Sequence, residues 1–123
     1  MAKTLLIIED NEQNFYVMRF LLEKRGFKIL GAENGRLGIQ MAVEHRPDGI
    51  LLDIQLPEMD GYAVAAELKS HHELNSVPII AVTSYAMVGD REHILAAGAN
   101  GYIEKPINPD TFVDEIVQFV GQP

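Results

Sequence analysis

Short apolar runs recur along the chain, and each is followed by a segment with the residue spacing of a helix. The runs are residues 3–8, 27–32, 50–52, 77–82 and 101–103. Runs this short, with almost no polar residues, are typical of strands that are buried on both faces. Strands that alternate with helices form a parallel sheet with helices on both sides. The sequence therefore predicts an α/β fold.

Helix signals lie between and after these runs, with a polar loop expected at residues 71–76. The helices are expected at residues 11–26, 35–45, 62–70, 87–97 and 108–121. Asn11 is the expected N-cap of the first helix and Gly26 its end, while Asn108 and Pro109 are expected to begin the last one. Right-handed crossovers favour the flavodoxin-like strand order 2-1-3-4-5, with five helices.

Length and composition limit what such a fold can do. The 123 residues suit a single domain, residues 1–123, and a net charge of −8 argues against binding to nucleic acid, which requires basic surface. No apolar run approaches the roughly 20 residues that span a bilayer, and we expect no signal peptide. The chain has no cysteine, which excludes disulfides and thiol catalysis and fits a cytoplasmic protein.

Polar side chains stand at the points where the predicted strands end. Glu9 and Asp10 follow the first strand, Asp53 ends the third, Thr83 ends the fourth and Lys105 follows the fifth. The carboxyl ends of parallel strands share one edge of the sheet, so these side chains are expected to converge. Three neighbouring carboxylates repel one another, and a hard divalent cation such as Mg²⁺ relieves that repulsion.

Each of these residues taken alone has a simpler interpretation. The simpler roles are a helix-capping loop for Glu9 and Asp10, a turn cap for Asp53, a strand end for Thr83 and a solvated charge for Lys105. Their common position at one edge of the sheet is what favours a functional site.

Several motifs together resemble the receiver domain of bacterial two-component response regulators, over the whole chain. They are Ile8-Glu9-Asp10-Asn11, the segment from Leu52 to Gly61, Val82-Thr83-Ser84, Ala97-Gly98-Ala99 and Lys105-Pro106. Residues 10–14 and 53–57 are most similar to single-domain DivK-like receivers and to receivers of hybrid histidine kinases. The resemblance implies a regulatory domain of a two-component system or phosphorelay, which catalyses only its own phosphorylation and dephosphorylation.

The resemblance assigns a role to each residue at this edge of the sheet. Asp53 is the expected phosphoacceptor, which attacks the phosphorus of a phosphohistidine or a small acyl phosphate. Asp10, Asp53 and the backbone carbonyl of Gln55 are the expected ligands of Mg²⁺ or Mn²⁺. Glu9 is expected to act on the metal through a water. Lys105 is expected to pair with Asp53 and then with a phosphoryl oxygen.

The resemblance also implies a conformational switch. Thr83 is expected to bind a phosphoryl oxygen and draw its loop towards Asp53, while Tyr102 turns into the space that Thr83 vacates. Taken alone, Tyr102 is an ordinary strand aromatic. The Lys105–Pro106 bond is expected to be cis.

The implied partners are proteins. A histidine kinase or histidine phosphotransferase supplies the phosphoryl group, and a downstream protein binds the face made by the fourth helix, the fifth strand and the fifth helix. We expect no nucleic-acid or membrane partner, and a monomer or at most a weak dimer.

Three positions depart from the family pattern. Glu9 replaces the commoner aspartate, Ser84 stands after Thr83 where alanine is usual, and Gly38 replaces a small alanine in the second helix. We expect Ser84 to alter loop closure slightly, and Gly38 to cost the helix about 1 kcal/mol relative to alanine.

Three other functions fit the same fold less well. A phosphohydrolase with an aspartate nucleophile needs a second aspartate two residues later, where this chain has Gln55. A flavodoxin needs a hydroxyl- or glycine-rich phosphate loop after the first strand, whereas residues 9–12 are mostly acidic and would repel phosphate. A docking module that is never phosphorylated stays open as an alternative, although every residue needed for phosphorylation is present.

Gln55 and Tyr85 are expected to flank the path of the water that hydrolyses the aspartyl phosphate. Because a bulky Tyr85 shields the acyl phosphate, we expect wild-type protein to lose its phosphoryl group more slowly than a Tyr85→Ala variant. The measurement is the decay of the phosphorylated protein after the donor is removed. Equal or slower decay in the variant would contradict the shielding.

Overall fold

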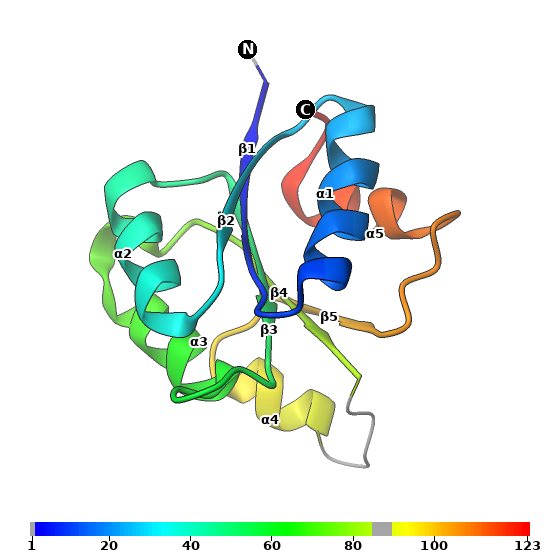
Figure 1. The fold of residues 1–123 in the computed structure, drawn as a ribbon. Coiled ribbons are helices and arrows are strands. Elements are labelled where there is room, and N and C mark those ends of the chain that lie inside the picture. Colours follow the sequence, from blue (N-terminus) through cyan, green and yellow to red (C-terminus); the bar gives the residue numbers. More distant parts are fainter. Residues whose placement is uncertain (1, 85–89) are drawn as a thin grey trace.

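The computed structural model describes residues 2–84 and 90–123, in which strands and helices alternate (Figure 1). The strands are β1 (Thr4–Ile8), β2 (Lys28–Ala32), β3 (Gly49–Asp53), β4 (Ile79–Thr83) and β5 (Gly101–Glu104). The helices are α1 (Glu12–Arg25), α2 (Gly35–His45), α3 (Gly61–Ser70), α4 (Asp90–Ala96) and α5 (Phe112–Val120), with a 3-10 turn, η1, at His72–Leu74.

The strands form one parallel sheet in the order β2-β1-β3-β4-β5, which confirms the predicted topology. β3 lies at the centre, where Ile50 is in register with Leu6 of β1 and Ile79 of β4. The chain crosses from one side of β1 to the other between β2 and β3. The carboxyl ends of β1 and β3 therefore border the crevice in which open α/β sheets place their ligands.

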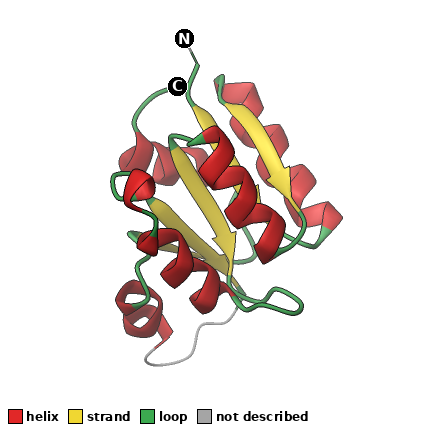
Figure 2. Ribbon diagram, turned by 90° about the vertical axis from the view of Figure 1, so that its left-hand side faces the viewer, coloured by secondary structure: helices red, strands yellow, loops and turns green. Residues whose placement is uncertain are grey.

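The apolar core forms two layers, one on each face of the sheet. Along β1, Leu6 and Ile8 pack into the layer beneath α2 and α3, whereas Leu5 and Ile7 pack into the layer beneath α1 and α5. The two helix pairs lie on opposite sides in Figure 1, and Figure 2 views the molecule from the side of α2 and α3. Because helices cover both faces of the interior strands, these strands carry apolar side chains at consecutive positions.

The predicted ends of α1 are confirmed. The side chain of Asn11 accepts a hydrogen bond from the N–H of Asn14 at 2.9 Å, as an N-cap does. Gly26 adopts a left-handed φ of 118°, and its N–H donates to the carbonyls of Leu22 and Glu23. Glycine reaches this conformation without the steric cost that a Cβ atom brings, so it ends the helix.

The last helix begins later than predicted, at Phe112. The side chain of Asn108 accepts a hydrogen bond from the N–H of Asp110 at 2.9 Å, and its carbonyl accepts from Thr111 and Phe112. The asparagine thus closes a turn ahead of the helix instead of capping it. The prediction that Asn108 and Pro109 begin this helix is therefore wrong.

Other expectations differ in part from the structure. The expected loop at residues 71–76 contains η1, whose Leu74 is buried in the core. Tyr85 and the expected start of the fourth helix at Met87 lie outside the described residues. Among the helices of residues 2–84 and 90–123, none is long and apolar enough to cross a membrane.

Gly38 lies where α2 packs directly on β1. A Cβ atom on Gly38 would lie 2.5 Å from Cδ1 and 2.7 Å from Cγ1 of Ile8. Carbon atoms do not approach so closely, so the side chain of Ile8 fills the space that an alanine would need. The glycine in the middle of this helix therefore has a packing reason, in spite of its poor helix propensity.

We expect Gly38→Ala to lower the free energy of unfolding by about 1 kcal/mol. Overpacking costs about 1–3 kcal/mol, and the better helix propensity of alanine offsets about 1 kcal/mol of that cost. Urea denaturation measures the change. Ile8→Val, which shortens the opposing side chain, should cost less stability in the Gly38→Ala background than in wild type. A Gly38→Ala variant that is more stable than wild type would contradict the packing explanation.

Candidate functional site

Asp53 lies at the carboxyl end of the central strand and is 4% exposed. Its Oδ1 accepts a hydrogen bond from the backbone N–H of Gln55 at 3.0 Å. The following loop turns back tightly, since the N–H of Gly61 donates to the carbonyl of Ile54 at 2.9 Å. A Cβ atom on Gly61 would overlap the Cα of Ile54, so only glycine fits there. These contacts hold the loop after β3 in place beside Asp53.

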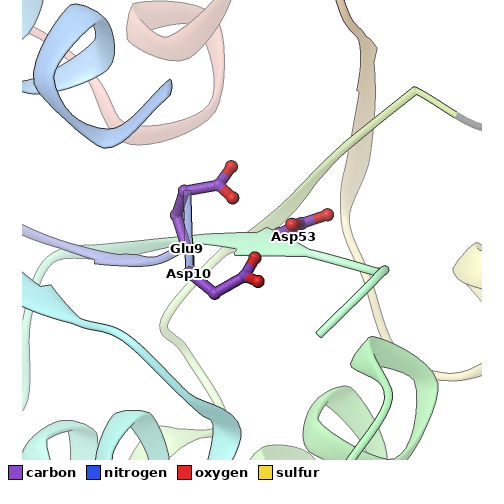
Figure 3. A group of neighbouring side chains, drawn as sticks. All are labelled: Glu9, Asp10 and Asp53. Carbon is purple, nitrogen blue, oxygen red and sulfur yellow. The ribbon is translucent and has the colours of Figure 1, made fainter. Parts of the chain in front are cut away.

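Glu9 and Asp10, directly after β1, bring two more carboxylates to Asp53 (Figure 3). One carboxylate oxygen from each of the three residues lies within 4.8 Å of the others. Glu9 is 3% exposed, whereas Asp10 is open to solvent. The convergence predicted from the strand ends is therefore observed. Such a set of oxygen ligands, partly open to water, has the chemistry that Mg²⁺ prefers.

Lys105, from the loop after β5, pairs with two of these carboxylates. Its Nζ lies 2.6 Å from Oε1 of Glu9 and 3.5 Å from Oδ2 of Asp53. The pair with Asp53 was expected, but the shorter contact with Glu9 was not. Lys105 is only 12% exposed at its side chain, so both ion pairs lie in a poorly solvated setting. The Lys105–Pro106 peptide bond is cis, as the resemblance implied.

Burial raises the pKa of Glu9 from 4.5 to about 7. The hydrogen bond from Lys105 opposes this shift, and the neighbouring Asp53 adds to it. Removing a carboxylate from water disfavours its charged form, and a second carboxylate nearby disfavours it further. Lys105 alone therefore does not offset the cost of holding these carboxylates ionised together.

The carboxylates and Lys105 line an open cleft of about 440 Å³. Its remaining lining residues are Asn11, Asn14, Gln55, Ser84 and Pro106. Within the part of the chain that the structure describes, every buried side-chain nitrogen or oxygen has a hydrogen-bond partner. The cleft thus combines an ordered polar floor with access for a small charged group.

The two expected switch residues lie on neighbouring strands. Thr83 ends β4 and is fully buried, and its carbonyl accepts a hydrogen bond from the N–H of Lys105 at 2.9 Å. Tyr102 lies in β5, is half-buried, and packs against the core layer beneath α2 and α3. Thr83 is in register with Glu104, two residues beyond Tyr102.

One contact of the cleft had no signal in the sequence. The hydroxyl of Ser84 donates to Oε1 of Gln55 at 2.8 Å, across 29 residues of chain. The sequence alone singles out each residue separately, Ser84 as a departure from the family pattern and Gln55 as an expected neighbour of the hydrolytic water. Their contact depends on the pairing of β3 with β4, which residue types alone do not show.

Known proteins match this chain along nearly its whole length. The family profile of the response regulator receiver domain covers residues 5–117. The polar-differentiation response regulator DivK of Brucella anthropi is 45% identical over 121 residues, which make up 98% of each chain.

Solved structures share the fold as well. The receiver domain of the sensor histidine kinase PA1611 from Pseudomonas aeruginosa has a magnesium ion coordinated in its active-site cleft. It matches with a TM-score of 0.90 at 33% identity, covering 99% of this chain and 100% of that one. A CheY-like receiver domain protein from Methanospirillum hungatei has a TM-score of 0.88 at 27% identity, covering 96% and 93%. With its acidic cluster at the strand ends, the chain therefore belongs to the response regulator receiver domain family, which is regulatory rather than enzymatic.

Proposed function

We propose that this chain is a signalling switch that is turned on when Asp53 accepts a phosphoryl group. The observation that carries the proposal is the environment of Asp53: a buried carboxylate at the floor of an open cleft, beside Lys105 and two further carboxylates. A buried nucleophile with a cation at hand suits phosphoryl transfer, in which charge stabilisation matters most.

A divalent cation, Mg²⁺ or Mn²⁺, fits the acidic cluster. Asp10, Asp53 and the backbone carbonyl of Gln55 would hold it, and Glu9 would act through a water. The raised pKa of Glu9 supports this assignment, because carboxylates that cannot all ionise together gain most from a cation. When bound, such a cation offsets negative charge on the phosphoryl oxygens.

Residues of the chain itself would orient the nucleophile and bind the transferred group. The N–H of Gln55 holds Oδ1 of Asp53, so Oδ2, on the side of Lys105, is the oxygen suited to attack. A bond forms from this oxygen to phosphorus as the phosphorus–nitrogen bond of a phosphohistidine breaks, and the imidazole leaves with the electron pair. Lys105 then binds a phosphoryl oxygen in place of the carboxylate.

Phosphorylation of Asp53 would change the surface that the protein presents to its partners. Thr83 would bind a second phosphoryl oxygen, and Tyr102 would turn inward as the loop after β4 closes. This motion alters the face formed by α4, β5 and α5, which a downstream protein binds. Residues 1–123 act as one receiver domain in the cytoplasm, as a monomer or a weak dimer, with a histidine kinase or histidine phosphotransferase as donor.

Phosphoryl uptake is the direct test of this proposal. Incubation with phosphoramidate and Mg²⁺ should add the mass of one phosphoryl group to wild-type protein, as measured by intact-protein mass spectrometry. Asp53→Asn removes the nucleophilic oxygen at nearly constant shape, so it should show no gain. A wild-type protein that stays unmodified, or an Asp53→Asn variant that gains the group, would overturn the assignment of Asp53.

The raised pKa of Glu9 predicts a dependence of stability on pH. In the folded protein this pKa is about 7, against 4.5 in the unfolded chain, so the stability that protonated Glu9 contributes is present below pH 4.5. It is lost as the pH rises to 7 and above. The side chain in the Glu9→Gln variant stays neutral at every pH, so this variant should not lose that stability as the pH rises.

Urea denaturation in EDTA at a series of pH values measures this effect. Relative to wild type, Glu9→Gln should gain up to about 3 kcal/mol between pH 4.5 and pH 7, since each pKa unit corresponds to about 1.4 kcal/mol. A difference between the two proteins that does not change with pH would show that Glu9 is not held protonated by burial. Glu33→Gln, on the exposed surface, is the matched control and should change little.

A further inference from the structure

The hydrogen bond from Ser84 to Gln55 joins the two loops that flank Asp53. Ser84 directly follows β4, and Gln55 lies two residues after Asp53 at the end of β3. The Ser84 hydroxyl and Oε1 of Gln55 are 2.8 Å apart, and both side chains are exposed and line the 440 Å³ cleft. The pair therefore joins the exposed part of the cleft lining, whereas Asp53, which lines the same cleft, is buried.

The two ends of this bond are anchored differently. Ser84 follows Thr83, which is fully buried and whose carbonyl accepts a hydrogen bond from the N–H of Lys105, so in this unphosphorylated structure the backbone leading to the serine is held on β4. The backbone N–H of Gln55 donates a hydrogen bond to Asp53, but the long side chain of Gln55 is exposed. An exposed glutamine side chain samples several rotamers unless a partner holds it. Ser84 supplies that partner.

We propose that Ser84 is a positioning residue that holds the Gln55 side chain across the mouth of the cleft and so slows the passage of phosphodonor and water to Asp53. This inference rests on the phosphorylation of Asp53 proposed above. Because the same opening serves both reactions, the bond slows the gain of the phosphoryl group from a small donor and its loss by hydrolysis alike. The net value of one hydrogen bond corresponds to about a two- to tenfold effect on each rate.

Three variants separate this role from a general disturbance of the site. Ser84→Ala removes the donor. Gln55→Met removes the acceptor and keeps the length of the side chain and the backbone groups. Ser84→Thr keeps the hydroxyl at an exposed position. Rates of uptake from phosphoramidate with Mg²⁺, and of decay after the donor is removed, are followed by intact mass, with circular dichroism to verify folding.

Ser84→Ala and Gln55→Met should each raise both rates about two- to tenfold. The double variant should be no faster than either single one, since both remove the same bond. Ser84→Thr should stay within about twofold of wild type, a smaller change than loss of the bond produces. Rates in Ser84→Ala that equal or fall below those of wild type, or effects that add in the double variant, would overturn the positioning role.

A measurement without donor or metal tests the bond itself. In wild-type protein the side-chain amide of Gln55 should show restricted motion by ¹⁵N relaxation, and in Ser84→Ala it should become mobile. Equal mobility in both proteins would show that Ser84 does not hold it. If wild-type protein takes up no phosphoryl group, the proposed function and this role fall together. If it does so and the variants match it, only the positioning role fails.

Discussion

The burial of β3 on both faces is the constraint on which the cleft depends. All five of its residues are buried, with Ile50 and Leu52 in one core layer and Leu51 in the other. A strand packed this way would expose apolar surface if it slid or tilted, and the free-energy cost of that exposure opposes such movement. Asp53, at its last position, is therefore held still at the edge of the sheet. For the phosphoryl transfer proposed above, this packing, more than the polar residues, would keep the nucleophile in position.

Electrostatics then determine what the fixed carboxylate can accept. Lys105 shares its charge between Glu9 and Asp53, and a single cation does not balance three carboxylates that lie within 4.8 Å of one another. The excess negative charge attracts a divalent cation but would repel a phosphoryl group that arrived alone. In the phosphoryl transfer proposed above, metal and lysine would be needed together, and the lysine would leave a carboxylate to bind the transferred group.

How well each feature could be predicted depended on how local its cause is. The caps of α1 were predictable because Asn11 and Gly26 act within a few residues of themselves. Asn108 had two local uses, a helix cap or a turn, and it forms a turn ahead of a helix that begins at the fully buried Phe112. The reason for Gly38 also lay outside its helix, because the atom that fills its space belongs to Ile8 of β1.

The sequence by itself determined the order of strands and helices and the residues that stand at the strand ends, because periodicity and residue type are local properties of a chain. Only the tertiary structure decided which of those residues touch. Lys105 lies closer to Glu9 than to Asp53, and Ser84 binds Gln55. These contacts join segments that follow different strands. The distances between the contacting side chains depend on the register of the sheet and on the packing of both helical layers.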